Sequence, residues 1–390
     1  MDRKDLHKIK IQRLSKWLNG ERPGPVKIDI EPTNTCNLKC MFCWTQSKER
    51  LAACQYDRLL DEKRILKIID EAAELDVVEW QIAGGWEPIV KPGLLIEMAK
   101  RIKSYDMYGC ITTNGTLFSE KMVRTLVDIG WDEILFSLEG AYADTHDFST
   151  RVNGSFEKST NAMSMFKKWK ENLISKKPDY SFHAVLTNKN YRQLADMIRL
   201  GKEIGCTGVN FEPLTVWSDV GKTLKLDEKQ TEEVKSYAKE ALKVAKELGI
   251  HTNAKNLLKT EFVKKEGMDQ ILKRESNKIQ RSKYPILTAP CFDPWLSLEI
   301  RVNGRAAPCR ICDFDSSCEN VLNKSLRDIW HGPYFENLRK KMIEGKMPDF
   351  CSDCAAGNIT TMLKMKKELI NNSRPFPINK IKGIVSRFER

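Results

Sequence analysis

The sequence predicts an α/β fold built on a parallel sheet. Six segments with the pattern of strands alternate with segments that have the pattern of helices, an order typical of parallel sheets with right-handed crossovers. Polar motifs follow the ends of several of these strands. Because ligands bind at the carboxyl ends of strands in such folds, we expect the functional site there.

The predicted elements follow in chain order. Strands are expected at residues 26–31, 77–83, 107–113, 133–138, 181–186 and 208–212. Helices are expected at residues 57–75, 92–105, 119–129, 155–172, 194–204 and 227–248. The first of these helices is predicted by the helical spacing of its apolar residues, Leu59, Leu60, Ile65, Ile68 and Ile69. Ser119 is expected to cap the third helix, with Met122 at the third position after it.

Composition excludes several classes of protein. The 390-residue chain has no apolar run near the ~20 residues that a membrane span needs, so a soluble chain is expected. Its net charge of +12 invites a nucleic-acid interpretation, but the charge is concentrated at the ends. Residues 1–27 carry eight basic and three acidic side chains, and residues 361–390 carry eight and two. The almost neutral body does not favour a nucleic-acid enzyme.

Twelve cysteines require an explanation. The first residues have no continuous apolar stretch of the kind found in a signal peptide. We therefore expect a cytoplasmic protein, in which dense cysteines are metal ligands or reactive thiols rather than disulfides.

Three cysteines lie in the loop after the first predicted strand. Cys36, Cys40 and Cys43 form a C-x3-C-x2-C motif. Three thiolates on a tight loop can hold three corners of a [4Fe–4S] cluster and leave the fourth iron open. Zinc is the alternative, but structural zinc sites prefer four protein ligands. The motif therefore favours an iron–sulfur cluster.

With the motifs that follow it, this loop resembles the radical S-adenosylmethionine (radical SAM) superfamily. The matching segments are Trp44 after the third cysteine, Gly84-Gly85-Trp86-Glu87-Pro88 after the second strand, Thr112-Thr113-Asn114-Gly115 after the third, Ser137-Leu138-Glu139-Gly140 after the fourth, and Arg151. The chain departs from the usual family pattern with Trp86 in place of a glycine and Glu139 in place of an aspartate.

The resemblance implies a fold and two cofactors. The fold is a partial (β/α)6 barrel with a smaller C-terminal auxiliary-cluster domain, and the cofactors are a [4Fe–4S] cluster and S-adenosylmethionine (SAM). It implies that Trp44 lies near the adenine, Ser137 near the ribose and Arg151 near the SAM carboxylate. The residues implied in cofactor binding are Trp44, Gly84, Gly85, Glu87, Pro88, Asn114, Ser137, Glu139 and Arg151.

The C-terminal cysteines resemble those of SPASM and twitch extensions, which bind auxiliary iron–sulfur clusters. Too few cysteines are present for two complete clusters. The resemblance implies one auxiliary [4Fe–4S] cluster on Cys291, Cys309, Cys351 and Cys354. Cys312 and Cys318 are further candidates, either as spare thiols or as ligands. A zinc ribbon built from the C-x2-C pairs is the alternative.

The remaining cysteines and histidines receive no ligand role. Cys54, Cys110 and Cys206 are expected to pack as small apolar residues, with hydrogen-atom donation to a substrate radical as the alternative for Cys110 and Cys206. The five histidines show no ligand spacing, and no general base is identified.

Both termini carry apolar residues at helical spacing among basic ones. Packing of these segments onto the barrel is expected. The alternatives are peripheral contact with an anionic membrane and docking of the flavodoxin or ferredoxin reductant that the family implies.

The predicted function is hydrogen-atom abstraction by a 5′-deoxyadenosyl radical formed from SAM. Small-molecule oxidation with the auxiliary cluster as electron acceptor is favoured. The alternatives are a peptide-modifying maturase, an enzyme for a lipid-associated substrate, and a non-catalytic iron–sulfur or zinc scaffold. The expected domains are an N-terminal basic segment, the barrel, a helical bridging segment, the auxiliary-cluster domain and a basic tail, at residues 1–25, 26–220, 221–290, 291–358 and 359–390.

Overall fold

The computed structural model describes residues 3–48, 51, 58–259, 285–310, 317–348, 351, 354 and 356–372. Its strands form one ten-stranded sheet with the order β10-β9-β8-β1-β2-β3-β4-β5-β6-β7. The strands are β1 (Lys27–Ile30), β2 (Glu79–Ile82), β3 (Tyr108–Thr113), β4 (Glu133–Ser137), β5 (Asp179–Leu186), β6 (Gly208–Pro213), β7 (His251–Thr252), β8 (Ser297–Ile300), β9 (Arg305–Ala307) and β10 (Glu319–Asn320).

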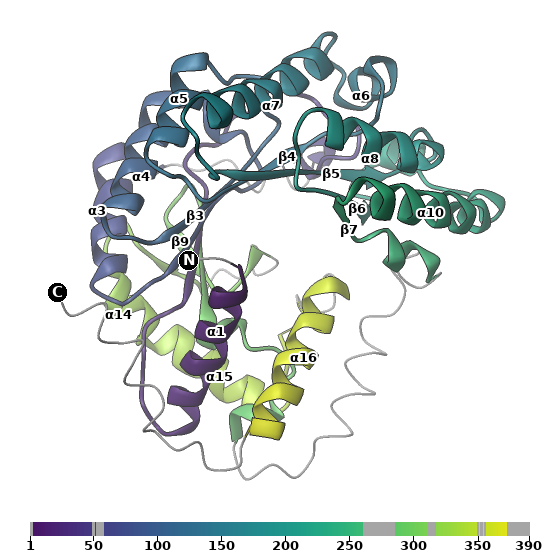
Figure 1. The fold of residues 1–390 in the computed structure, drawn as a ribbon. Coiled ribbons are helices and arrows are strands. Elements are labelled where there is room, and N and C mark those ends of the chain that lie inside the picture. Colours follow the sequence, from purple (N-terminus) through teal and green to yellow (C-terminus); the bar gives the residue numbers. More distant parts are fainter. Residues whose placement is uncertain are drawn as a thin grey trace.

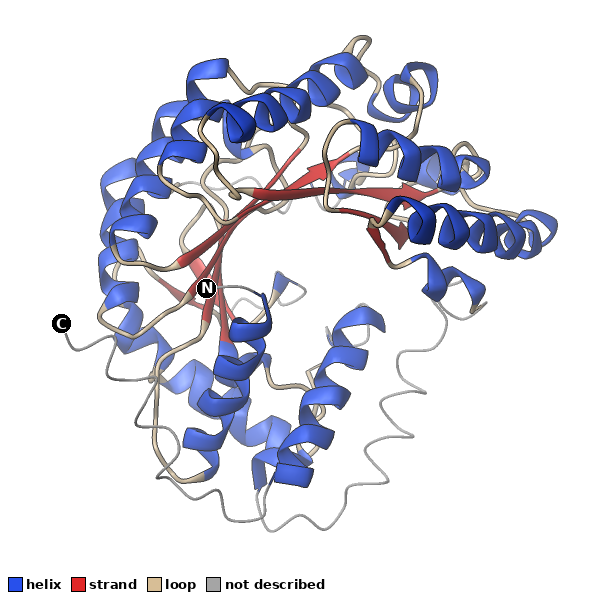
Figure 2. Cartoon of the chain, in the orientation of Figure 1, coloured by secondary structure: helices blue, strands red, loops and turns tan. Residues whose placement is uncertain are grey.

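The six predicted strands correspond to β1–β6, and each pairs in parallel with the next. The sheet curves into an open barrel whose outer face is covered by helices (Figures 1 and 2). The α/β class and the partial barrel are therefore confirmed. The structure adds β7 beside β6 and β8 beside β1, both parallel to their neighbours.

The helices of the described residues alternate with the strands through the barrel. They are α1 (Arg3–Leu18), α3 (Glu62–Ala73), α4 (Pro92–Ser104), α5 (Glu120–Asp128), α6 (Ala143–Thr150), α7 (Ser155–Asn172), α8 (Leu194–Glu203), α9 (Asp219–Lys222), α10 (Glu228–Leu248), α13 (Asp293–Leu296), α14 (Leu326–Trp330), α15 (Pro333–Ile343) and α16 (Ala356–Asn372).

Local chemistry sets where these helices begin. Helix α3 starts at Glu62, later than predicted, because the Asp61 side chain caps it by accepting the Arg64 N–H. Leu59 therefore precedes the helix and is exposed, which corrects its predicted place on the buried face. The predicted cap of α5 is confirmed, since Ser119 accepts the Met122 N–H.

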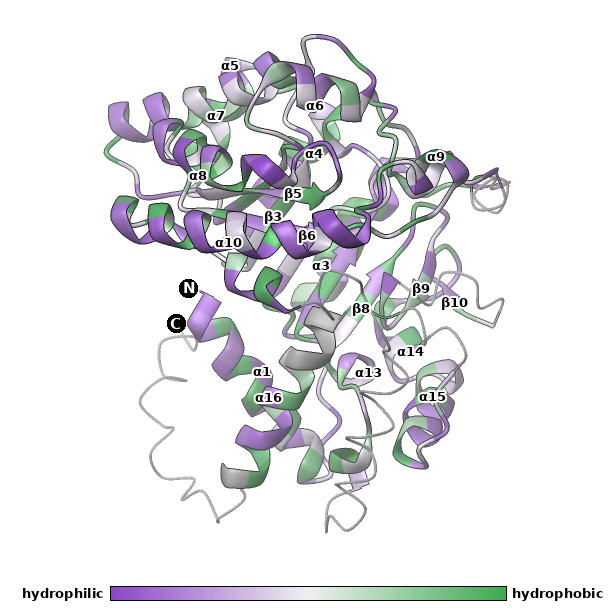
Figure 3. Ribbon diagram, turned by 90° about the vertical axis from the view of Figure 1, so that its right-hand side faces the viewer, coloured by the Kyte–Doolittle hydropathy of each residue, from purple (hydrophilic) through white to green (hydrophobic). Residues whose placement is uncertain are grey.

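The predicted bridging segment begins inside the barrel fold. Helix α10 buries Val234, Ala238 and Ala241 in the main core, and β7 pairs with β6. In Figure 3, α10 presents a largely hydrophilic outer surface, as a helix with one buried face should. Residues 260–284 lie outside the described part.

The N-terminal segment packs into the molecule. Leu14 of α1 is buried with Trp295, Met365 and Leu369 in a second apolar cluster, which joins α1 to α16. Buried Arg13 donates to the carbonyls of Gly24 and Asp76. The packing expected for this segment is therefore observed, whereas the tail beyond residue 372 lies outside the described residues. No helix in the described ranges is both long and apolar enough to cross a membrane.

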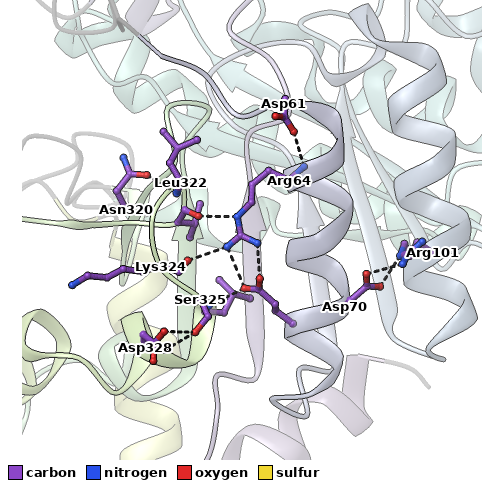
Figure 4. A network of polar contacts seen from close by, with 12 residues as sticks. Asp61, Arg64, Asp70, Arg101, Asn320, Leu322, Lys324, Ser325 and Asp328 are labelled. Carbon is purple, nitrogen blue, oxygen red and sulfur yellow. Dashed lines mark hydrogen bonds and ion pairs between the residues drawn. The ribbon is translucent and has the colours of Figure 1, made fainter.

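An ion pair on α3 fastens the C-terminal region to the barrel (Figure 4). Arg64 Nη1 donates to Glu71 Oε1 at 2.5 Å, Nε donates to the Val321 carbonyl at 2.7 Å, and Nη2 donates to the Lys324 carbonyl at 3.0 Å. Glu71 Oε2 accepts the Leu326 N–H at 2.9 Å. Both side chains are largely buried, so their polar atoms depend on one another for hydrogen bonds.

We expect Arg64→Met to lower the free energy of unfolding by about 2–3 kcal/mol, because it leaves the Glu71 carboxylate and two carbonyls without their donor. Anaerobic urea denaturation measures the change. Arg64→Met combined with Glu71→Met is expected to recover part of the loss, and an unchanged midpoint in the single variant would contradict the role of the pair.

Candidate active site

The loop with the first three cysteines follows β1 at the carboxyl edge of the sheet. Its backbone is held against the end of α6, where the Lys39 and Met41 N–H groups donate to the Thr150 and Ser149 carbonyls at 3.1 and 2.9 Å. Burial raises the pKa of the Cys40 thiol well above its usual value, and the negative charges of Glu139, Cys43 and Cys36 raise it further. The three thiols therefore lie within electrostatic reach of one another.

This chemistry fits a cationic cluster. Cys36 is exposed, and Cys40 and Cys43 are half-buried. Adjacent thiolates need positive charge to stay deprotonated together, and the irons of a [4Fe–4S] cluster supply it. Among the described side chains, no three His, Cys, Asp or Glu are close enough to share one metal ion. A cluster does not require that closeness, since its thiolates bind different irons.

Trp44 packs on the glycine pair that follows β2. A Cβ on Gly85 would lie 2.1 Å from Trp44 Cζ2, and a Cβ on Gly84 would lie 2.2 Å from Glu31 Cγ. Trp86 meets Trp44 edge to face with ring centroids 5.3 Å apart. Gly85 is therefore needed for the close approach of Trp44, and Gly84 for that of Glu31.

Glu87 turns its carboxylate into the protein. It accepts the Thr113 hydroxyl at 2.7 Å and the N–H groups of Asn114 and Ile89 at 2.8 and 3.0 Å. Burial raises its pKa, and these hydrogen bonds oppose the rise. Glu87 therefore holds the end of β3 beside the loop after β2, and buried Pro88 continues that loop into a short 3-10 turn, Pro88–Val90.

Asn114 ties the end of β3 to the cysteine loop. Its Nδ2 donates to Asn37 Oδ1 at 3.0 Å, and its Oδ1 accepts the Thr116 hydroxyl at 2.7 Å. Asn37 Nδ2 also donates to Thr116 Oγ1 at 2.7 Å. The three side chains thus form a closed set of hydrogen bonds next to Cys36.

The end of β4 brings two histidines to the site. Ser137 Oγ lies 3.3 Å from His183 Nε2 on β5, and burial lowers the pKa of His183 to about 4. His146 is fully buried, and its Nδ1 accepts the Glu139 N–H at 2.9 Å. Sequence reasoning assigned neither histidine a role.

Glu139 and Arg151 occupy different environments. Burial raises the pKa of Glu139 to about 8, and its Oε2 accepts the Val185 N–H at 2.8 Å. Arg151 is exposed at the end of α6 with a left-handed backbone (φ 59°). The predicted SAM contacts of these residues stay predictions.

The four auxiliary cysteines line one cavity of about 640 Å³, which also reaches the barrel interior. Burial raises the pKa of Cys291 well above its usual value, and the charges of Asp293, Cys309 and Cys354 raise it further. Burial also raises the pKa of Cys351 to about 12, and Cys354 adds to that rise. The four half-buried thiols line one site, and their number and charge suit a cluster. Cys318 lies elsewhere, with its thiol 3.3 Å from the Tyr334 hydroxyl, and Cys312 lies outside the described residues.

The same cavity is lined by charged side chains of β1 and β8 and by Arg310, which is exposed. Arg310 lies 3.4 Å from Asp29 and 3.5 Å from Glu299, and Lys27 lies 3.0 Å from Asp29. Burial raises the pKa of Glu299 to about 7. On the barrel side, the lining comes from Gln81, Thr112, Leu135 and Glu212.

The other cysteines behave as apolar residues where they are described. Cys110 is buried beside Leu6 and Tyr108, and the Cys206 thiol lies 3.7 Å from Met163 Sδ in the core. Both environments agree with the expected packing role. Cys54 lies outside the described residues.

Two family models match the chain. Residues 30–201 match the radical SAM superfamily, and residues 291–355 match the iron–sulfur cluster-binding SPASM domain. The chain is a radical SAM protein with a SPASM domain. The radical SAM domain implies a [4Fe–4S] cluster and SAM, and the SPASM domain implies auxiliary iron–sulfur clusters.

This radical SAM chain is similar to known proteins over most of its length. The "tungsten-containing aldehyde ferredoxin oxidoreductase cofactor-modifying protein" of Pyrococcus furiosus is 24% identical, over 86% of this chain and 88% of its own. The PqqA peptide cyclase of Granulibacter bethesdensis is 25% identical, over 85% of this chain and 79% of its own. Streptococcus suis SuiB bound to precursor peptide SuiA shares the fold with a TM-score of 0.60 at 18% identity, over 85% of this chain and 70% of its own.

We expect Gly85→Ala to weaken SAM binding about tenfold or more, because the new methyl group must displace the Trp44 ring or the glycine backbone. Equilibrium dialysis of the anaerobically reconstituted protein with labelled SAM measures the affinity. Gly93→Ala is the control, since a Cβ at Gly93 meets nothing within 4 Å. An affinity within twofold of wild type would contradict the predicted contact at Gly85.

His146 is expected to contribute stability that is lost as the pH falls. Burial lowers its pKa to about 4 from 6.5, so the unfolded chain binds a proton between these values and the folded protein does not. His146→Asn keeps an acceptor for the Glu139 N–H but does not titrate. Between pH 7 and 5, wild type should lose about 2 kcal/mol relative to the variant, measured by urea denaturation of both proteins. A difference that stays constant with pH would contradict this expectation.

Proposed function

We propose that this radical SAM enzyme oxidises a small molecule bound inside the barrel, with an auxiliary [4Fe–4S] cluster on Cys291, Cys309, Cys351 and Cys354 accepting the electron. The observation that carries the proposal is the shared cavity, which barrel-strand side chains and all four cysteines line together. A substrate in this cavity lies next to the acceptor.

The size of the cavity supports a small substrate. The cavity of about 640 Å³ would also contain the auxiliary cluster on its four cysteines, so only part of it is open to a substrate, which fits a small molecule. Its charged side chains, Lys27, Asp29, Glu299 and Arg310, would orient a polar substrate by ion pairs and hydrogen bonds. Burial of Asp29 and Glu299 strengthens these interactions, because water screens them weakly there.

At the carboxyl end of the barrel strands, the residues of the predicted SAM site would bind and position the cofactors. When bound, the cluster on Cys36, Cys40 and Cys43 supplies the electron that cleaves SAM to the 5′-deoxyadenosyl radical, which abstracts a substrate hydrogen atom. Trp44 and Gly85 would position SAM by close packing, and Ser137 would bind its ribose. Glu87 and Asn114 would keep the surrounding loops in place.

The number of cysteines supports an electron-transfer role for the auxiliary cluster. Four thiolates provide a protein ligand to every iron of a [4Fe–4S] cluster, so no iron is left open for the substrate to bind. Oxidation of the substrate radical then releases one electron to this cluster and one proton. A flavodoxin or ferredoxin is the proposed reductant for the first cluster.

Peptide modification is the second candidate. Similarity to PqqA peptide cyclase over 85% of this chain favours it. Small-molecule and peptide fractions of a cell extract distinguish the two candidates by which of them stimulates formation of 5′-deoxyadenosine. Stimulation by the peptide fraction alone would overturn the small-molecule proposal.

We expect the triple variant Cys36→Ala/Cys40→Ala/Cys43→Ala to retain about four irons per chain and to form no 5′-deoxyadenosine with dithionite and SAM, because one auxiliary [4Fe–4S] cluster remains. Iron analysis and chromatography measure the two results. The wild type is the control, with about eight irons and SAM cleavage. About eight irons in the triple variant would indicate two auxiliary clusters, and no iron would contradict the auxiliary site.

A further inference from the structure

Glu31 lies between the two cofactor sites. It follows β1 directly and is only 3% exposed. Its Oε1 accepts the Gly85 N–H at 3.1 Å, within the predicted SAM motif. The Glu31 side chain also occupies the space that a Cβ on Gly84 would need, since an added Cβ would lie 2.2 Å from Glu31 Cγ. The conformation of the glycine pair therefore depends on where this side chain lies.

Arg301 connects Glu31 to the auxiliary cysteines. Its Nη1 donates to Glu31 Oε1 at 2.5 Å, and its Nη2 donates to the Arg310 carbonyl at 2.6 Å. Arg310 is next to Cys309 in the sequence. A single guanidinium thus touches both the residue that supports the glycine pair and the backbone of an auxiliary-cysteine loop.

The ion pair is well suited to fix geometry. Arg301 is 8% exposed, so both partners are shielded from water. A planar guanidinium presents its N–H groups in a rigid fork, whereas a lysine ammonium is a single point charge on a flexible chain. Only the arginine can reach Glu31 and the Arg310 carbonyl at once with fixed angles.

We propose that the Glu31–Arg301 ion pair is a positioning pair that sets the geometry of the Gly84–Gly85 motif and of the Cys309 loop together. Movement of either partner displaces both sites, because the same guanidinium bonds to each. The inference rests on the predicted SAM contact of the glycine pair and on the auxiliary cluster of the proposed function, and it goes beyond the oxidation chemistry.

A second ion pair provides a matched control. Arg64 and Glu71 also join the barrel to the C-terminal region through an arginine fork that donates to backbone carbonyls. Their partners belong to residues 321–326, and neither side chain contacts the cysteine loops or the glycine pair in the contacts of the described residues. Arg64→Lys therefore weakens a comparable junction away from both cofactor sites.

The test compares Arg301→Lys with Arg64→Lys in anaerobically reconstituted full-length protein. Equilibrium dialysis with labelled SAM reports the first site. Electron paramagnetic resonance of the reduced auxiliary cluster, recorded in the Cys36→Ala/Cys40→Ala/Cys43→Ala background, reports the second. We expect Arg301→Lys to weaken SAM binding at least about fivefold and to change the auxiliary signal, while Arg64→Lys changes neither. Equal results for the two variants would overturn the proposal.

Glu31→Gln covers the case in which Arg301→Lys does not fold. It keeps the shape and an acceptor for the Gly85 N–H but removes the nearer of the two carboxylates beside Arg301, the other being Glu299 at 3.7 Å. The auxiliary signal should therefore change more than the SAM affinity. An unchanged auxiliary signal in this variant would also overturn the proposal. Absence of auxiliary iron in the wild type would instead contradict the proposed function, which separates the two failures.

Discussion

The pairing of β8 with β1 determines how the two cofactor sites face each other. These strands run parallel, with Lys27 opposite Ser297 and Ile30 opposite Ile300. The pairing makes the C-terminal region an extension of the barrel sheet. As a result, the cysteine loop follows the carboxyl end of β1, whereas Cys291 precedes the amino end of β8. The two thiol sets are thereby placed toward opposite ends of the barrel interior.

Burial and charge make both predicted thiol sets suited to a cationic ligand. At each site, burial and neighbouring negative charges raise thiol pKa values, so deprotonation without a cation would be costly. The carboxylates nearby follow the same rule, since burial raises the pKa of Glu139 to about 8 and that of Asp293 to about 6. A bound cluster reverses this balance by supplying positive charge.

Local patterns made the barrel predictable. Each of β1–β6 and most of their helices carry a periodic apolar signal, and the cysteine and glycine motifs are contiguous in sequence. Strands β7, β9 and β10 are two or three residues long, too short for any period to be visible. Their pairing comes from tertiary contacts.

The least predictable part of the site is its charged connection. Glu31 and Arg301 are 270 residues apart, and neither belongs to a motif. Glu87 was predicted from its motif, but its inward-facing carboxylate depends on Thr113 and Asn114 from another strand. Sequence motifs thus identified the residues of the predicted cofactor sites, whereas the groups that hold those residues in place emerged only from the folded chain.

The position of the cavity constrains the reaction further. A substrate between the two sites has the predicted SAM site toward the carboxyl ends of the strands and the auxiliary cysteines toward their amino ends. Hydrogen abstraction and electron removal would then occur from opposite sides of the same molecule. Buried Glu299, whose pKa burial raises to about 7, lies on the auxiliary side, so the proton released with the electron would have an acceptor there. Under the proposed function, this separation would favour net oxidation, because the electron and the proton would leave away from the 5′-deoxyadenosine that could otherwise return a hydrogen atom.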